Sequence, residues 1–299
     1  MKFIEELYEK YSVEFRARLN GDELTPEQFR ARFGAELNGL EQVEIDRLSG
    51  HGVLYYCLSE QDGRQICVIP AYGCYASSDR TLTDLFILLS EKLVQRKSTR
   101  FQMHFYAHDT ASQRLFSMMQ FGCMAETGIA KTALTDPRPT ADCAIRTLSR
   151  AEAAERWDEI WAMTASILRH LQSAPVFYPC LEFTEELYRA YFLDETTHLH
   201  VAFDEKGRMI GMIETNAEPN AMLRDNVPSA NIGEIYVEPA RRGSGLSDSL
   251  FRHALAYEKE HGTDYLWVEH GTANPNARGF WGRYFDTYEY ELDRFIEAF

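Results

Sequence analysis

The residues best suited to chemistry in this chain lie in a glycine-rich turn that joins a strand-like segment to a helix-like one. An apolar run over residues 232–237 precedes the turn, and an amphipathic pattern follows it. Glycine lets a backbone approach a ligand closely, and the amides that open a helix attract anions with the help of the helix dipole. We therefore expect a phosphate cradle at this turn. Its N–H groups belong to Gly243, Ser244, Gly245, Leu246 and Ser247.

The spacing within this turn separates it from two other phosphate-binding motifs. A Walker loop ends its glycine run with Lys and then Ser or Thr, whereas Leu246 and Ser247 stand there, and a dinucleotide fingerprint needs a third glycine where Asp248 stands. Through Arg242 and Gly245 the turn resembles the coenzyme A pyrophosphate loop of the GNAT acetyltransferases, written Q/R-x-x-G-x-G/A. Ser247 departs from the Gly or Ala of that pattern, but it is small.

A second segment downstream resembles the same family. Strand-like residues 265–270 are followed by Asn274-x-x-Ala277-x-x-Phe280-Trp281, with Asn suited to a helix N-cap. The GNAT family carries a similar N-x-x-A-x-x-F/L-Y/W helix, whose small Ala lies against the pantetheine arm of the coenzyme. An ordinary capped amphipathic helix would show much the same pattern, so the assignment depends on both segments in this order.

The resemblance implies acetyl-CoA as co-substrate. It also implies that the strand before the loop diverges from the next strand, and that an N–H near Val237 meets the thioester oxygen. The residues expected to bind the coenzyme are Ile235, Tyr236, Val237, Arg242, Gly243, Ser244, Gly245, Leu246, Ser247, Asn274, Ala277, Phe280 and Trp281.

Glu234 is the best candidate for the base that acetyl transfer to an amine requires. It lies three residues before Val237 in an otherwise apolar run, and strand alternation places the two on opposite faces. A carboxylate with a pKa raised by burial, or one that acts through water, could take the ammonium proton. Glu234 could instead bind the acceptor or pair with an arginine, and Glu269 and His270 are rivals for the role.

Tyr284 is the candidate for protonating the departing thiolate. Many family members have Tyr where Trp281 stands, and an indole cannot supply that proton. Tyr284, three residues on, could replace it, although packing is the alternative role. Solvent could also protonate the thiolate, because the pKa of a thiol makes its thiolate a tolerable leaving group.

The same pattern of elements occurs twice in the chain, with a constant step of 165 residues, as between positions 85 and 250. The corresponding segments are 85–86 and 250–251, 101–103 and 266–268, and 115–116 and 280–281. A repeated set of elements at one offset indicates a duplicated domain. Applied to the coenzyme loop, the step reaches Ser77 and Arg80, where no glycine eases backbone approach. The first copy is therefore expected to be degenerate and to lack a coenzyme site.

These observations predict a mixed α/β fold of two tandem GNAT-like domains, each a central, mostly antiparallel sheet flanked by helices. The first domain would cover residues 1–136 and the second 143–299, with a proline-containing polar linker between them. In the second domain we expect a capping box at Ser149, a helix start near Thr184 and a hairpin turn at Gly207. Its expected strands are residues 143–148, 198–203, 209–215, 232–237, 265–270 and 288–295.

The acceptor pocket is expected to draw on two loops, residues 168–183 and 218–230. The first contains His170, Phe177, Tyr178 and Pro179, and the second contains Asn220, Arg224 and Asp225.

Charge and cysteine content narrow the classes of partner and compartment. A formal net charge of −15 argues against nucleic acid, and no apolar stretch approaches the length of a membrane span. The six cysteines show no C-x-x-C pair, so we expect reduced thiols in a cytoplasmic protein and no metal site. The N-terminus lacks the pattern of a signal or transit peptide.

The sequence thus favours a GNAT-type N-acetyltransferase that acetylates a primary amine of a small molecule. A non-catalytic acyl-CoA sensor or scaffold, and an enzyme that acetylates a protein or peptide, stay as alternatives.

Overall fold

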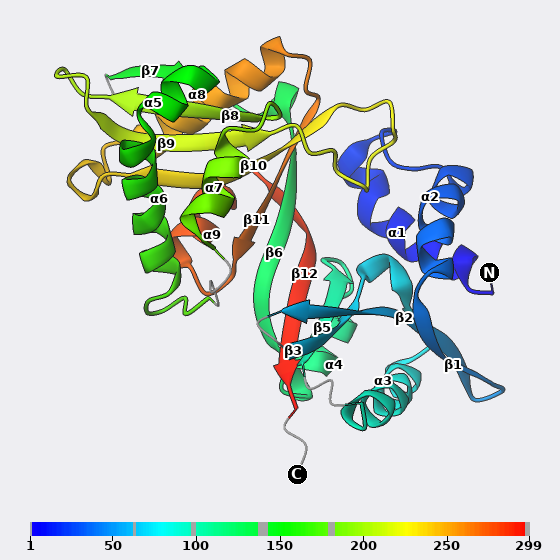
Figure 1. Ribbon diagram of the computed structural model, residues 1–299. Coiled ribbons are helices and arrows are strands. Elements are labelled where there is room, and N and C mark those ends of the chain that lie inside the picture. Colours follow the sequence, from blue (N-terminus) through cyan, green and yellow to red (C-terminus); the bar gives the residue numbers. More distant parts are fainter. Residues whose placement is uncertain (1, 62–63, 97–99, 137–142, 179–182, 297–299) are drawn as a thin grey trace. The chain divides into compact units, whose positions relative to one another are not determined.

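The computed structural model describes residues 2–61, 64–96, 100–136, 143–178 and 183–296, which form two compact units (Figure 1). Unit 1 consists of the described residues of Met1–Thr127, Met222–Arg224 and Thr287–Phe299, and unit 2 of those of Gly128–Ala221 and Asp225–Asp286. The predicted linker prolines, and also Pro179 and Cys180, lie outside the described residues.

The sheet of unit 1 is mixed and mostly antiparallel. Strand β3 pairs parallel with β5, whereas β1 with β2, β2 with β3 and β5 with β12 pair antiparallel. Strand β4 pairs antiparallel with β2 beside the main order. The neighbouring strands, in order, are β1 (Glu41–Arg47), β2 (Gly50–Gln61), β3 (Arg64–Ile69), β5 (Arg100–Tyr106) and β12 (Asp286–Phe295), with β4 at Cys74–Ala76.

Two pairs of helices cover the sheet of unit 1. Side chains of α3 and α4 join one core with the sheet, in which Phe86 and Phe116 pack edge to face. Helices α1 and α2 meet through aromatic rings, among them Tyr11, Phe15 and Phe29. The bounds are α1 (Ile4–Leu19), α2 (Pro26–Asn38), α3 (Asp79–Val94) and α4 (Thr110–Met118), with a short 3-10 turn at Ala71–Gly73.

The sheet of unit 2 is also mixed and mostly antiparallel. Strand β10 pairs parallel with β11, whereas β10 with β9, β9 with β8 and β8 with β7 pair antiparallel. The order is β11 (Tyr265–Gly271), β10 (Ser229–Val237), β9 (Met209–Asn216), β8 (Thr197–Phe203) and β7 (Ala144–Thr147). These strands match the predicted ones, and Gly207 has the positive φ of +74° that the predicted hairpin turn requires.

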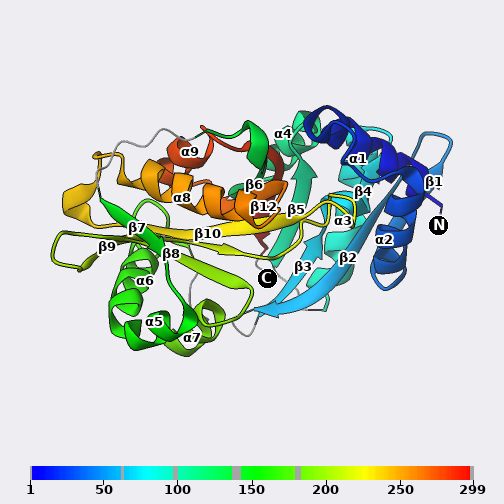
Figure 2. The ribbon, with the colours of Figure 1, turned by 90° about the horizontal axis from the view of Figure 1, so that it is seen from above.

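Helices cover both faces of this second sheet, as Figure 2 shows within the unit. Helices α5 (Arg150–Glu155), α6 (Trp157–Leu171) and α7 (Glu185–Phe192) build one core with it, and α8 (Leu246–Glu260) and α9 (Pro275–Trp281) build the other. The predicted capping box at Ser149 is present, and Thr184 caps α7. The helix that opens after Ser149 ends at Glu155, so the stacked Trp157 and Trp161 belong to the separate helix α6.

The predicted repeat is confirmed at the level of whole elements. Strand β5 starts at Arg100 and β11 at Tyr265, and α4 starts at Thr110 and α9 at Pro275, so both pairs keep the 165-residue step. In each copy a parallel strand pair precedes the helix: β3 with β5 before α4, and β10 with β11 before α9. The chain therefore has a tandem arrangement of one mixed α/β fold.

The last strand lies in a different unit from the one expected. Residues 288–295 do form a strand, but β12 pairs antiparallel with β5 of unit 1. Arg100 forms an ion pair with Asp293 at 2.5 Å, and His104 contacts Glu289 at 2.9 Å, while Leu292 is buried in the unit 1 core. The described C-terminal segment from Thr287 on thus completes the first unit. Strand β6 (Gly122–Lys131) contributes its first residues to unit 1 and its last to unit 2.

None of the helices in the described residues combines the length and the low polarity that crossing a membrane demands. In the same residues, no cluster of three or more His, Cys, Asp or Glu side chains has the geometry to hold a metal ion. Among the cysteines, Cys67 and Cys74 are buried, whereas Cys123 is exposed.

Candidate active site

Strand β10 carries a β-bulge in the middle of unit 2. Its register with β9 shifts between Ile232, which pairs with Thr215, and Ile235, which pairs with Ile213. Two residues of β10, Gly233 and Glu234, therefore lie opposite one residue of β9. A bulge leaves part of the backbone outside the ladder and redirects the side chain it carries. The residue redirected here is the predicted base.

The parallel pairing of β10 with β11 is short. It joins Ser229 to Tyr265, Ala230 to Leu266 and Asn231 to Trp267, and the recorded register ends there. The rest of β10, up to Val237, continues past the bulge without entering this register. The divergence implied by the family resemblance therefore begins at Asn231.

Glu234 lies on the face of β10 that meets α6 and α7. The hydroxyl of Tyr188 donates to its Oε1 at 2.8 Å. Burial raises the pKa of Glu234, and the Tyr188 hydrogen bond partly offsets this effect by stabilising the carboxylate. Tyr236 packs on the same side, whereas Ile235 and Val237 pack on the α8 side, as strand alternation predicts.

Glu214, opposite the bulge, is a second carboxyl group that the sequence analysis missed. It is 2% exposed, and its Oε1 accepts the backbone N–H of Glu234 at 3.0 Å. The Tyr191 hydroxyl donates to its Oε2 at 3.1 Å. Burial raises the pKa of Glu214 to about 8, and the neighbouring Glu234 adds to the rise. The signal in the sequence is a lone acid in the otherwise apolar run of β9.

The glycine loop between β10 and α8 has the geometry of an anion cradle. Gly243 and Gly245 adopt the left-handed conformation, with φ of +77° and +81°. A Cβ on Gly243 would have no atom within 4 Å, so its surroundings are open. The N–H of Ser244 donates to the Arg241 carbonyl at 3.3 Å, which removes it from the five amides expected to face a ligand.

The first turn of α8 supplies the other amides. Within the described residues, the N–H groups of Gly243, Gly245, Leu246 and Ser247 donate to no recorded acceptor, and Gly245 provides no side-chain cap. The Leu246 side chain is buried in the core, so it anchors this turn while its amide stays available. Arg242 is exposed beside these groups. These four amides can bind a phosphate or diphosphate without displacing an existing bond.

The corresponding helix of unit 1 is capped by the chain itself. Ser78 precedes α3, and its hydroxyl oxygen accepts the N–H of Thr81 at 3.2 Å. The Ser77 hydroxyl oxygen likewise accepts the N–H of His51 at 3.0 Å. A side chain thus caps this helix start, where unit 2 has glycine, and the absence of a coenzyme site in unit 1 stays a prediction.

Tyr284 lies beside the cradle but is engaged. Its hydroxyl donates to Asp248 in the first turn of α8, and Arg283 forms an ion pair with the same carboxylate at 3.1 Å. Burial and the hydrogen bond to Asp248 raise the pKa of Tyr284 to about 12. These contacts neutralise an acidic side chain next to an expected anion site. Tyr284 as the proton donor stays a prediction.

Helix α9 begins as its sequence predicts. The Asn274 side chain accepts the N–H groups of Asn276 and Ala277, and the partly exposed Ala277 packs against the α8 core. Trp281 is 3% exposed and packs edge to face on Phe251 of α8. Its indole is therefore a packing group.

The two loops expected to form the acceptor pocket belong to different units. Phe177 is 68% exposed in the first loop, within unit 2. In the second loop, Met222–Arg224 belongs to unit 1, where Arg224 donates to the Glu23 carbonyl at 2.8 Å. Asn220 in unit 2 donates its N–H to the Ser229 hydroxyl. Glu269 is exposed and His270 is half-buried at the end of β11.

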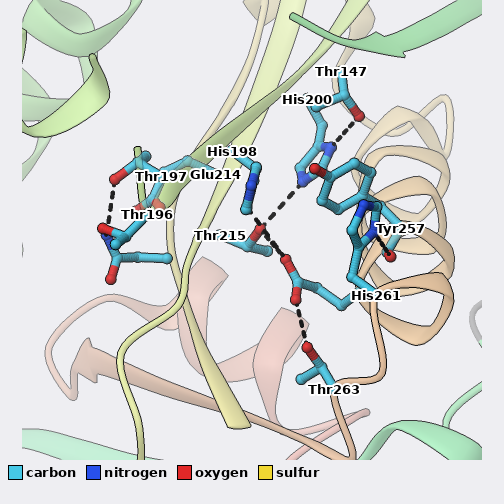
Figure 3. A network of polar contacts seen from close by, with 12 residues as sticks. Thr147, Thr196, Thr197, His198, His200, Glu214, Thr215, Tyr257, His261 and Thr263 are labelled. Carbon is cyan, nitrogen blue, oxygen red and sulfur yellow. Dashed lines mark hydrogen bonds and ion pairs between the residues drawn. The ribbon is translucent and has the colours of Figure 1, made fainter. Parts of the chain in front are cut away.

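A histidine network lies on the α8 side of the sheet (Figure 3). His200 is fully buried, with ring nitrogens 2.9 Å from the Thr147 hydroxyl and 3.3 Å from that of Thr215. Thr215 donates to Glu258 at 2.6 Å. Burial, together with the nearby His253 and His198, lowers the pKa of His200 to about 3. His200 is therefore neutral and holds β8 and β9 beneath the coenzyme-loop helix.

This network predicts acid sensitivity of unit 2. Since the folded pKa of His200 lies below its unfolded value of about 6.5, the unfolded state binds more protons as pH falls, and stability is lost below that value. Between pH 7.5 and 5.5 one such group costs about 1.4 kcal/mol. We expect His200→Gln to reduce the pH dependence of the unfolding free energy, measured with urea, by about this amount. His170→Gln, the control, should leave it unchanged; an equal dependence in both variants would contradict the assignment.

The described geometry defines a class of protein: a mixed α/β unit with a bulged, splayed strand, followed by a glycine cradle at a helix start. Residues 164–286 match the model of the acetyltransferase (GNAT) family. The family match covers this stretch alone, and the chain as a whole shares its fold with a solved tandem GNAT protein.

Solved structures agree with the fold. A GCN5-related N-acetyltransferase from Sphaerobacter thermophilus superposes with a TM-score of 0.57 at 13% identity, covering 99% of this chain and 94% of that one. A tandem GNAT protein from the clavulanic acid biosynthesis pathway gives 0.53 at 12% identity, covering 99% and 96%. A glucosamine N-acetyltransferase region of a fungal multi-domain GH3 β-N-acetylglucosaminidase gives 0.54 at 14% identity, covering 99% of this chain and 37% of that one. A search of curated protein sequences found no match.

Proposed function

We propose that this protein transfers the acetyl group of acetyl-CoA to a primary amine of a small molecule, by direct attack in unit 2. The observation that carries the proposal is the cradle of amides from Gly243, Gly245, Leu246 and Ser247, which make no recorded bond within the described residues, beside a bulged strand with a carboxyl group. The amides and Arg242 fit the diphosphate of the coenzyme. The end of the β10–β11 pairing at Asn231 leaves backbone for the pantetheine arm.

In this proposal Glu234 accepts the proton that the acceptor ammonium loses, directly or through water. The neutral amine attacks the thioester carbonyl and a C–N bond forms. As the C–S bond breaks, the nitrogen loses its second proton to water, so that the products are the amide and the coenzyme thiolate. The N–H near Val237 stabilises the oxyanion. The thiolate takes its proton from Tyr284 or from water. The Tyr284 hydroxyl already donates to Asp248, and this hydrogen bond must break before Tyr284 can protonate the thiolate.

The alternative of an acyl-CoA sensor has one observation in its favour. Trp281 occupies the position where many family members carry Tyr, and Tyr284 is bonded to Asp248. A sensor and an enzyme share the cradle, so binding alone does not separate them. Turnover does.

A screen of free CoA release tests the proposed function. We expect release from acetyl-CoA with at least one class among polyamines, amino acids and aminoglycosides, at rates well above hydrolysis without acceptor. Peptides with free N-termini serve as the comparison panel. Acetyl-CoA binding by calorimetry without release from any amine would favour the sensor, and release with peptides alone would favour a protein or peptide acetyltransferase.

A further inference from the structure

The bulge in β10 is built around the Glu214 side chain. Gly233 lies opposite that carboxyl group, and a Cβ on Gly233 would come within 2.1 Å of Glu214 Oε1 and 3.2 Å of its Cδ. The next nearest atom, the side-chain oxygen of Asn231, would be at 3.4 Å. Glycine is therefore required at position 233, because any side chain there would collide with the Glu214 carboxyl group. Its φ is not in the left-handed region, so an alanine there is limited by that carboxyl and not by backbone strain.

One helix holds both carboxyl groups. Tyr188 and Tyr191, three residues apart on α7, donate to Glu234 at 2.8 Å and to Glu214 at 3.1 Å. The Glu234 N–H, which the bulge removes from the ladder, donates to Glu214 at 3.0 Å. The three bonds link the backbone and the side chain of Glu234 to a buried neighbour. A bulge without this acceptor would leave a buried amide unpaired, at a cost typical of a lost hydrogen bond.

We propose that Glu214 is a positioning residue for acyl transfer: its carboxyl group fixes the bulged Gly233–Glu234 backbone and so aims the Glu234 side chain at the acceptor amine. This inference depends on the proposed function, because the role of Glu234 as base belongs to it. Glu214 itself touches neither the acceptor nor the thioester in this account. It acts through the Glu234 amide.

The charge state of Glu214 extends the inference. The groups that act on it are Glu234 on β10, Tyr191 on α7 and Glu218 in the loop after β9, while Leu199 lies opposite on β8. With its pKa near 8, Glu214 carries a proton at pH 7. The proton fits best on Oε2, because Oε1 already accepts an N–H and the Tyr191 hydroxyl can accept as well as donate. Glu234 is then free to ionise without a second negative charge beside it.

A double-mutant cycle tests the positioning. Gly233→Ala alone pushes the carboxyl group off the Glu234 amide, so we expect kcat to fall about tenfold or more while the fold, followed by circular dichroism, is kept. Glu214→Ala should cost a similar factor. In the double variant the alanine at position 233 meets no carboxyl group, so its added effect should be under about threefold. If the fold-losses in kcat of the two single variants multiplied in the double variant, the two residues would act independently and the proposal would be overturned.

The neutral isostere separates positioning from general packing. Gln at position 214 can still accept the Glu234 N–H, so Glu214→Gln should keep kcat at pH 7 within about threefold of wild type. Between pH 7 and 9 the wild-type rate should rise relative to this variant with a midpoint near 8, because an ionised Glu214 strengthens the proton affinity of Glu234. A merely structural residue would give a ratio that does not vary with pH, and that result would refute the inference.

A measurement without turnover keeps this test apart from the proposed function. The backbone amide resonance of Glu234 should shift with a midpoint near pH 8 in wild type and lose this titration in Glu214→Gln. A titrating amide together with no CoA release from any amine would remove the proposed function, and with it the catalytic meaning of the contact. CoA release together with an amide that does not titrate, and a pH-independent ratio of rates, would remove the inference alone.

Discussion

Gly243→Asp is expected to lower the affinity for acetyl-CoA at least about 100-fold while leaving the fold intact. The new carboxylate would face the diphosphate at the cradle, and like charges about 5 Å apart repel by roughly 3 kcal/mol at an effective dielectric constant of about 20. The side chain has room, since no atom lies within 4 Å of a Cβ at this position. The loss should therefore come from charge at the site, and isothermal calorimetry with acetyl-CoA measures it.

Gly207→Asp is a matched control for that variant. Gly207 lies in the hairpin turn of the same unit, with a φ of +74° against +77° at Gly243, and a Cβ there also has no atom within 4 Å. The two variants thus share the backbone strain and the added charge, and they differ only in place. Similar melting temperatures with affinity lost in one variant alone would support the cradle. Undiminished affinity of Gly243→Asp would show that the coenzyme does not bind there.

The elements of the site could be predicted because their signals are local. Asn274 caps α9 through its own side chain, and Gly207 makes a turn by its own φ, so neither depends on distant residues. The 165-residue step depends only on apolar spacing, and β5 and β11 keep it. Local patterns of this kind do not depend on a ligand, as the Ser78 cap of α3 in unit 1 illustrates.

The parts that the sequence analysis missed depend on pairing between distant segments. Alternation places Glu234 correctly on one strand face, but no pattern within β10 reveals that Glu214 on β9 bonds to its backbone. The unit to which β12 belongs is set by partners such as Arg100 and Asp293, almost two hundred positions apart. A strand's own residues predict that it is a strand, and not which sheet edge it joins.

Glu234→Gln should lower kcat by a factor of about 100 or more, with little change in acetyl-CoA affinity. General bases typically contribute 10²–10⁴-fold, and the amide of Gln cannot take the ammonium proton. Gln keeps the size of Glu and can still accept from Tyr188 at 2.8 Å in the wild-type geometry. Part of the loss should be recovered at high pH, where more of the acceptor amine is already neutral. Steady-state rates of CoA release from pH 6 to 10 measure both effects, and Glu205→Gln, an exposed acid in the same unit, is the control.

Tyr188→Phe should shift the pH dependence of the rate in a defined direction. This shift tests whether Glu234 acts as the base or only binds the amine. The Tyr188 hydrogen bond lowers the pKa of Glu234 against the rise that burial causes, so its loss should raise that pKa further. The acid limb of the rate profile, where the base becomes protonated, should then move to higher pH, while the plateau changes little. If Glu234 only bound the amine through its negative charge, Tyr188→Phe and Glu234→Gln would instead raise KM and leave kcat unchanged. Equal rates of wild type and Glu234→Gln at every pH would exclude Glu234 as the base, and the acceptor would then lose its proton to solvent.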